Sequence, residues 1–279
     1  MTTTGTPAAT PAPDLAAIKR RQRQAWGSGD YAAVAARIQL IAECLVDAAD
    51  LQAGSQVLDV ATGSGNAALA AARCGCEVTG IDYVPELLER ARVRAAAEGL
   101  QVEFREGDAE DLPAADASFD AVLSCLGVMF TPDQERAAAE LLRVCRPGGV
   151  IALASWMPSG FIGQMFRTVS RHVPPPAGAR PPGLWGTRQR LEELLGAGVS
   201  GLETGEREFV FRFRSPDDFA RFFRDNYGPV HKAFEALDDA GREQLHDDLA
   251  ALARTHDRGP GPSLAIPSTY LEAVATRSP

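Results

Sequence analysis

Residues 56–66 read QVLDVATGSGN, and this stretch decides the fold. The first six residues, QVLDVA, form a short apolar run that is typical of a buried β-strand. The next four, TGSG, are turn-forming, and an alanine-rich segment that favours a helix begins at Asn66. A strand that ends in a glycine-rich turn and opens into a helix predicts a ligand site. Small residues let the ligand approach the backbone, and the helix N-terminus offers free N–H groups.

Strand-like and helical segments alternate on the C-terminal side of this turn. The segments that are typical of strands are residues 56–61, 77–81, 102–104, 119–124, 150–155, 208–214 and 270–276. Such alternation predicts an α/β fold with a doubly wound, mostly parallel sheet. We expect the last two segments to pair antiparallel at one edge of that sheet.

The flanking segments predict the remaining organisation of the chain. Residues 1–13 are rich in Thr, Ala and Pro and are expected to form a disordered tail. Residues 14–50 are expected to form an N-terminal cap of two helices, and residues 51–279 the main domain. Within that domain, the aromatic-rich residues 216–255 are expected to form a helical lid inserted before the last strand.

Acidic residues near the ends of three strands indicate a nucleotide-like cofactor. Asp82 closes the second strand, seventeen residues after Gly65, where a carboxylate can accept hydrogen bonds from ribose hydroxyls. That much fits NAD as well as S-adenosylmethionine (SAM). Asp59 stands inside the first strand, where the dinucleotide pattern calls for no acid. Asp108 follows the third strand, where an acid can accept a hydrogen bond from an adenine amino group. These two acids favour SAM.

Five ordered motifs resemble the class I SAM-dependent methyltransferases, especially the branch that includes the ubiquinone and menaquinone methyltransferases. The motifs are VLDVATGSGN (57–66), VTGIDYVPELLERAR (78–92), FREGDAEDLP (104–113), FDAVLSCLGVMF (119–130) and LLRVCRPGGVIALASW (141–156). Their order and spacing are specific for the fold and the cofactor, and not for the substrate. The resemblance implies a Rossmann-like, seven-stranded sheet and an enzyme that converts SAM to S-adenosylhomocysteine.

The same resemblance implies the cofactor contacts, carried over by motif position. Asp59, Ala61 and Gly63 would line the methionyl end, within the turn that also contains Thr62 and Gly65. Many relatives have glycine where this chain has Ala61. Asp82 would hold the ribose hydroxyls. Tyr83, Asp108 and the Ala109 N–H would contact the adenine, and Ser124 and Cys125 would lie beside the methionyl amine.

Four residues outside the motifs are further candidates for the site, two for the cofactor and two for catalysis. Trp26 and Tyr31 flank a glycine-rich break in the N-terminal cap and are candidates to close over the cofactor. His231 and Tyr227 flank a Gly-Pro break in the insertion. They are the candidates for a general base, which helps if the acceptor is a hydroxyl.

Composition limits the partners of the protein. A net charge of −9 and a pI near 5.0 argue against nucleic-acid binding, and no apolar run is long enough to span a membrane. Five cysteines and no export signal predict free thiols in the cytoplasm. The CGC segment at residues 74–76 has no second Cys/His pair, so no metal is expected. The basic run Lys19–Arg23 predicts a solvated helix face. The oligomeric state stays open.

The sequence thus predicts a SAM-dependent methyltransferase acting on a hydrophobic or aromatic small molecule. We expect an enclosed aromatic pocket between the lid insertion and residues 129–130. O-methylation is the first expectation, and C-methylation of a quinol-like or other small molecule is the second. Three alternatives remain: a SAM-binding enzyme that does not methylate, an NAD-dependent oxidoreductase and a catalytically silent binding subunit.

Overall fold

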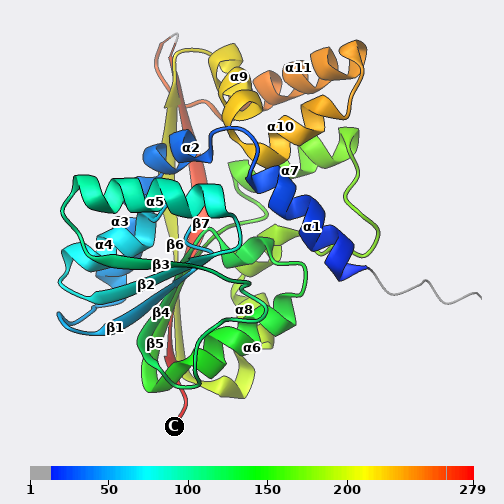
Figure 1. Cartoon of the computed structure of the whole chain (residues 1–279). Helices are drawn as coiled ribbons and strands as arrows, with labels where there is room; N and C mark the ends of the chain where they lie inside the picture. Colours follow the sequence, from blue (N-terminus) through cyan, green and yellow to red (C-terminus); the bar gives the residue numbers. More distant parts are fainter. Residues whose placement is uncertain (1–13, 262) are drawn as a thin grey trace, which may run out of the picture.

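The computed structural model describes residues 14–261 and 263–279, so the predicted tail, residues 1–13, lies outside the described part. One sheet has the strand order β3-β2-β1-β4-β5-β7-β6. The strands are β1 (Gln56–Val60), β2 (Glu77–Asp82), β3 (Val102–Glu106), β4 (Phe119–Cys125), β5 (Cys145–Trp156), β6 (Val199–Phe213) and β7 (Leu264–Arg277). Strands β1 to β5 are parallel, and β7 runs antiparallel to both β5 and β6 (Figure 1). The predicted mostly parallel sheet with an antiparallel edge is confirmed.

Strand β1 lies inside the sheet, between β2 and β4, and both of its faces are covered. Val57, Leu58 and Val60 are fully buried, which explains why this strand is a continuous apolar run and not an alternating one. The helices between the parallel strands are α4 (Asn66–Arg73), α5 (Pro85–Ala97) and α6 (Gln134–Val144), and a short 3-10 turn, η1 (Val128–Phe130), follows β4. The carboxyl ends of these strands meet at one edge, where the ligand of such a sheet is expected.

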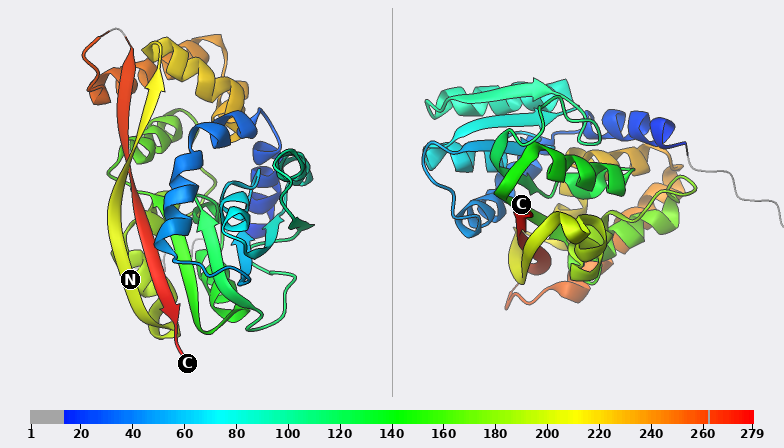
Figure 2. Two further views of the ribbon diagram at one scale, coloured as in Figure 1. Left: turned by 90° about the vertical axis from the view of Figure 1, so that its left-hand side faces the viewer. Right: turned by 90° about the horizontal axis from the view of Figure 1, so that it is seen from below.

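The antiparallel edge is longer than predicted. Residues 270–276 and 208–214 do lie in neighbouring antiparallel strands of one sheet, but they do not face each other directly. Tyr270 faces Arg207, and Glu208 faces Thr269, because each strand extends several residues beyond its predicted bounds. The outer strand β6 is largely exposed over residues 199–208, so its sequence there has no apolar alternation to mark it. Figure 2 shows the two strands as a long twisted pair along one side of the molecule.

The N-terminal cap differs in detail from its prediction. Asp14 caps α1 (Leu15–Trp26), and its carboxylate accepts a hydrogen bond from the Ala17 N–H at 2.9 Å. The predicted second helix is instead two helices, α2 (Tyr31–Arg37) and α3 (Gln39–Ala48), because Ile38 leaves the helical conformation. The apolar spacing continues through this break, which is why periodicity alone did not reveal it.

Helices from distant parts of the chain gather at the carboxyl ends of the strands. Between β6 and β7 the chain forms the insertion helices α9 (Pro216–Asn226), α10 (Gly228–Glu235) and α11 (Asp239–His256). Figure 1 shows them grouped with α1 and with α7 (Phe161–His172) at one end of the sheet. Opposite them, α8 (Arg188–Leu195) packs beside α6. No helix within the described ranges is long and apolar enough to cross a membrane.

The loop after α1 packs backbone to backbone on the start of α10. A Cβ atom at Gly228 would lie 1.9 Å from the carbonyl oxygen of Ala25, and one at Gly29 would lie 2.8 Å from that of Asn226. Only glycine permits these approaches. The N-terminal cap and the insertion helices are therefore closely joined above the end of the sheet.

Candidate functional site

The turn after β1 is held in place by a buried carboxylate. One oxygen of Asp59 accepts hydrogen bonds from the Thr62 hydroxyl at 2.6 Å and from the Ala68 N–H at 2.9 Å. Within the turn, Ala61, Gly63 and Gly65 all have positive φ, at 54°, 57° and 89°. The backbone thereby curls away from the strand and opens into α4. Burial raises the pKa of Asp59 to about 7, although the two hydrogen bonds oppose this rise.

Asp82, at the end of β2, ties this turn to the neighbouring strand. Its side-chain oxygens accept hydrogen bonds from the N–H groups of Gly63 and Val84, both at 2.9 Å. The residue is only 5% exposed. Burial raises the pKa of its carboxyl to about 6, while the backbone N–H groups act in the opposite direction. Asp82 is therefore a fixed acceptor at the rim of the pocket.

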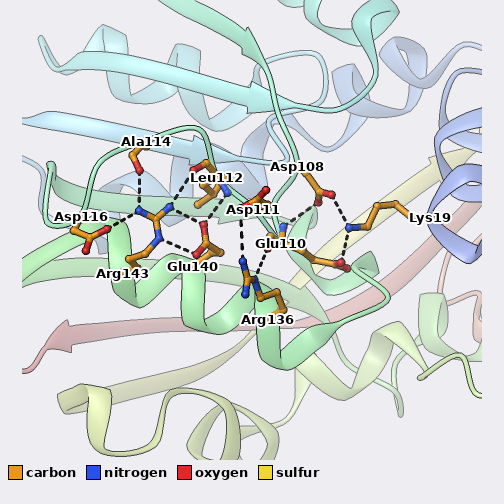
Figure 3. Close-up of polar contacts among 10 residues, drawn as sticks. All are labelled: Lys19, Asp108, Glu110, Asp111, Leu112, Ala114, Asp116, Arg136, Glu140 and Arg143. Atoms are coloured by element: carbon orange, nitrogen blue, oxygen red, sulfur yellow. Dashed lines mark hydrogen bonds and ion pairs between the residues drawn. The ribbon is translucent and has the colours of Figure 1, made fainter. Parts of the chain in front are cut away.

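The loop after β3 places a second acid on the same pocket. Asp108 accepts a hydrogen bond from the Glu110 N–H at 2.9 Å, and its other oxygen pairs with Lys19 Nζ at 2.5 Å (Figure 3). Lys19 also pairs with the buried Glu110 at 2.5 Å. Another residue of α1, Arg23, pairs with Glu106 at 2.6 Å. Helix α1 is thus fastened across this side of the pocket by ion pairs.

Helix α6 braces the same loop from below. Glu140 accepts a hydrogen bond from the Leu112 N–H at 2.7 Å, and Arg143 pairs with Glu140 at 2.7 Å (Figure 3). The Arg136 guanidinium donates to the Glu110 carbonyl at 2.8 Å. These contacts join the loop to α6 and support the position of Asp108 at the pocket.

These elements enclose a pocket at the carboxyl end of the sheet. The predicted residues that line it are Trp26, Tyr31, Ala61, Thr62, Gly63, Asp82, Tyr83, Asp108, Ala109 and Cys125. Three other predicted residues lie behind its surface. Asp59 and Gly65 shape the turn, and the Ser124 hydroxyl donates to the Val60 carbonyl at 2.7 Å and accepts from the Val128 N–H at 3.0 Å.

A second, aromatic cavity adjoins the first. Its lining consists of Trp26, Tyr31, Val34, Ile38, Leu126, Phe130, Trp156, Ile162, Met165, Phe211, Phe223 and Tyr227. Five of these residues also line the first pocket: Trp26, Tyr31, Ile38, Leu126 and Phe130. The rings around Trp26 meet edge to face, with centroids 5.5 Å from Tyr31, 4.9 Å from Phe130 and 5.3 Å from Tyr227. The two cavities therefore lie on either side of these five side chains.

The structure brings Tyr227 to this site but not His231. Tyr227 is 6% exposed and precedes α10, where it faces the aromatic cavity. His231 lines neither cavity. Its ring contacts the Arg224 carbonyl at 3.0 Å and the Glu235 carboxylate at 3.1 Å, on the outer side of the insertion helices. A partly exposed His paired within its own helix is a surface residue, so His231 is not placed to serve the site.

The aromatic cavity was expected next to residues 129–130, but most of its aromatic lining comes from other elements. Phe130 does line both cavities, but Met129 lines neither. Trp156, at the end of β5, and Phe211, on β6, complete the wall together with residues of α7. Their contribution depends on the tertiary packing of β5, β6 and α7. The sequence pattern of each separate element does not predict that packing.

The predicted solvated basic helix face is exposed at Arg20, Arg21 and Arg23, but Lys19 is partly buried in ion pairs with the loop after β3. Lys19 and Arg23 are four residues apart and therefore share one face of α1. That face forms ion pairs with Glu106 at the end of β3 and with Asp108 and Glu110 in the loop after it. The sequence shows these acids in the segment FREGDAED (104–111), but it does not show that they pair with α1. Within residues 14–261 and 263–279, no cluster of His, Cys, Asp or Glu side chains is arranged to hold a metal ion.

Comparisons with known proteins place the chain in a family. Residues 58–153 match the family described as a methyltransferase domain. An uncharacterized Mycobacterium tuberculosis protein, Rv1405c, is similar to this chain, with 42% identity over 82% of this chain and 85% of that protein. The demethylmenaquinone methyltransferase of Thermus thermophilus is 38% identical over 54% of this chain and 71% of that protein.

Solved structures support the fold. The crystal structure of the YcgJ protein from Bacillus subtilis superposes with a TM-score of 0.60. The superposition covers 86% of this chain and 98% of that chain at 18% sequence identity. At this low identity, the similarity shows a shared fold only.

Proposed function

Because this chain belongs to the class I SAM-dependent methyltransferases, we propose that it methylates a hydrophobic or aromatic small molecule, and that it does so on oxygen. The observation that carries the proposal is that the two cavities adjoin each other. The first pocket, called the polar pocket because it carries Asp82 at the end of β2 and Asp108 after β3, shares the side chains of Trp26, Tyr31 and Phe130 with the aromatic cavity. Small-molecule sites are typically apolar with a few placed polar groups.

The residues of the polar pocket fit SAM. Asp82 would hold the ribose hydroxyls, and Asp108 with the Ala109 N–H would hold the adenine edge. Gly63 would leave room for the methionyl end, since a Cβ atom there would fill the space beside Tyr31, 3.3 Å from its ring. Bound SAM supplies a methyl group on a positively charged sulfur, which is activated for displacement. The protein then has to orient the acceptor in line with that methyl group and exclude water.

The aromatic cavity would hold the acceptor, covered by the insertion helices acting as a lid. Phe223 and Tyr227 from these helices face Trp26 from the cap, so the roof is formed by two segments distant in the sequence. The free volume left between the side chains is about 20 Å³, roughly that of one water molecule. Acceptor binding therefore requires these rings to rotate or the lid to shift.

Carbon methylation is the second candidate, and the similarity to demethylmenaquinone methyltransferases favours it. A panel of phenols, carboxylic acids, quinols and amines, assayed for methyl transfer from SAM, separates the two. We expect turnover of hydroxylated aromatic compounds, with mass spectrometry of the product placing the new methyl group on oxygen. Methylation of a ring carbon would establish the second candidate instead. Tight S-adenosylhomocysteine binding without methylation of any acceptor would favour a non-methylating SAM enzyme.

Cofactor affinity is expected to depend on pH through Asp82. Ribose hydroxyls donate to an ionised carboxylate, so a pKa of about 6 means that a proton must be released on binding below that pH. S-adenosylhomocysteine should bind roughly tenfold more weakly at pH 5 than at pH 7. Calorimetry on Asp82→Asn should show affinity lowered roughly 10- to 100-fold at pH 7 and little pH dependence. Wild-type affinity in this variant would remove Asp82 from the site.

A further inference from the structure

The aromatic cavity is lined without a charged side chain. Its lining residues, all within the described part of the chain, include no Asp, Glu, His, Lys or Arg. The acids and the lysine of the site all belong to the polar pocket, at its ribose and adenine ends. The acceptor cavity of the proposed function, on which this inference rests, therefore offers neither a carboxylate nor an imidazole to remove a proton.

Four weakly acidic groups face the site from the elements packed around it. Tyr31 comes from α2, Tyr227 from the start of α10, Cys125 from the end of β4 and Tyr83 from the turn after β2. Burial raises the pKa of each of them above its ordinary value, and the charge of Asp82 raises that of Tyr31 further. At neutral pH these groups carry their protons, so none of them is an available base.

We propose that the acceptor is a phenol- or enol-type acid that enters the cavity as its anion, having lost its proton to bulk water. Its aromatic or conjugated character follows from the walls, since the rings of Trp26, Phe130 and Tyr227, which meet edge to face, offer apolar surface to a conjugated molecule once they move apart to admit it. The charge follows from the absence of a base among the lining side chains.

An apolar cavity favours this charge state for a second reason. The anion meets its opposite charge at the sulfonium of bound SAM, and the two charges cancel as the reaction proceeds. A low-dielectric environment strengthens their attraction and favours a transition state in which charge disappears. An amine acceptor would instead leave a cation in the cavity, with no carboxylate there to stabilise it or to take its proton.

The step balances without a further reactant. A lone pair on the acceptor oxygen forms the new C–O bond while the C–S bond breaks, and the electron pair of that bond stays on sulfur. An anion and a cation become a neutral ether and neutral S-adenosylhomocysteine. Because an unpaired anion in an apolar cavity is unfavourable, the acceptor should bind only after SAM.

Kinetics on 4-nitrophenol, 4-cyanophenol and 4-chlorophenol test the inference, because these phenols are similar in size but ionise at different pH. The midpoint of kcat/KM against pH should follow the acceptor, moving upward from the most to the least acidic phenol. The same midpoints should persist in Tyr31→Phe and Tyr227→Phe, whatever rates these variants keep. A midpoint common to all three phenols, or one that moves in either variant, would mean that the protein supplies a base and would overturn the proposal.

Absorbance titration gives a readout that does not need turnover. The 4-nitrophenolate anion is titrated in the presence of sinefungin, which has an ammonium group where SAM has its sulfonium, or of neutral S-adenosylhomocysteine. We expect binding at least about tenfold tighter with sinefungin. Equal binding, or binding of the neutral phenol only, would refute the inference. Methylation of amines with no phenol turned over would also refute it, yet leave the proposed methyltransferase function intact.

Discussion

Replacing Gly228 with alanine is expected to lower methyl transfer by roughly a hundredfold, because it separates the two halves of the roof over the acceptor cavity. The new Cβ atom would lie 1.9 Å from the Ala25 carbonyl oxygen and 3.0 Å from that of Ser28. These are backbone atoms, so no side chain can rotate to relieve the clash. Helix α10 must move away from the loop after α1, and Tyr227 then leaves Trp26.

The matched control is Gly205→Ala on the exposed part of β6, where a Cβ atom meets nothing within 4 Å. Steady-state kinetics should show wild-type turnover for this control. For Gly228→Ala, S-adenosylhomocysteine affinity should stay within about tenfold, because much of the polar pocket is formed by the turns that follow β1, β2, β3 and β4. Overpacking of this kind costs about 1–3 kcal/mol, which thermal unfolding will register as a lower Tm. Wild-type turnover in a folded Gly228→Ala protein would show that the roof does not position the acceptor.

The central sheet could be predicted from the sequence because each buried parallel strand is a local apolar run followed by a turn. Residues 56–66 alone indicate this fold, because they contain an apolar strand, a turn of small residues and the start of an alanine-rich helix. The outer edge could be predicted only in part. Phe209, Phe211 and Phe213 alternate and marked β6, whereas residues 199–207 face solvent and carry no such pattern. A strand on an exposed edge forms because it hydrogen-bonds to the backbone of the neighbouring strand. The sequence of one segment does not show that pairing.

The polar pocket was also largely accessible from sequence, because its residues lie at fixed places after successive strands. The aromatic cavity was not, since its walls come from α1, α2, β5, β6, α7 and the insertion helices. The aromatic residues of the insertion were visible as a set, but Phe219 packs into the core against Phe161 and Phe213, and Tyr227 faces the cavity. Sequence periodicity cannot separate these two roles, because a lid and a core both require an apolar face.

Replacing Gly63 with valine is expected to weaken S-adenosylhomocysteine binding by at least about a hundredfold, or roughly 2.7 kcal/mol. Two effects act together. Gly63 has φ of 57°, a conformation that a β-branched residue adopts only with considerable strain. Its Cβ would also lie 3.3 Å from the Tyr31 ring, so the larger side chain would project into the space beside that ring. Any shift of the turn further breaks the hydrogen bond from the Gly63 N–H to Asp82.

Gly99→Val separates lost binding from lost stability. Gly99 has a similar φ of 69°, but it follows α5 on the surface and a Cβ atom there meets nothing within 4 Å. The backbone strain of the two variants should therefore be comparable, and the melting temperature without ligand should fall in both, further in Gly63→Val because its side chain also meets the Tyr31 ring. Calorimetry should then show wild-type S-adenosylhomocysteine affinity for Gly99→Val and the large loss only for Gly63→Val. If both variants lose affinity equally, the turn after β1 acts through overall stability, and Gly63 does not form the cofactor surface.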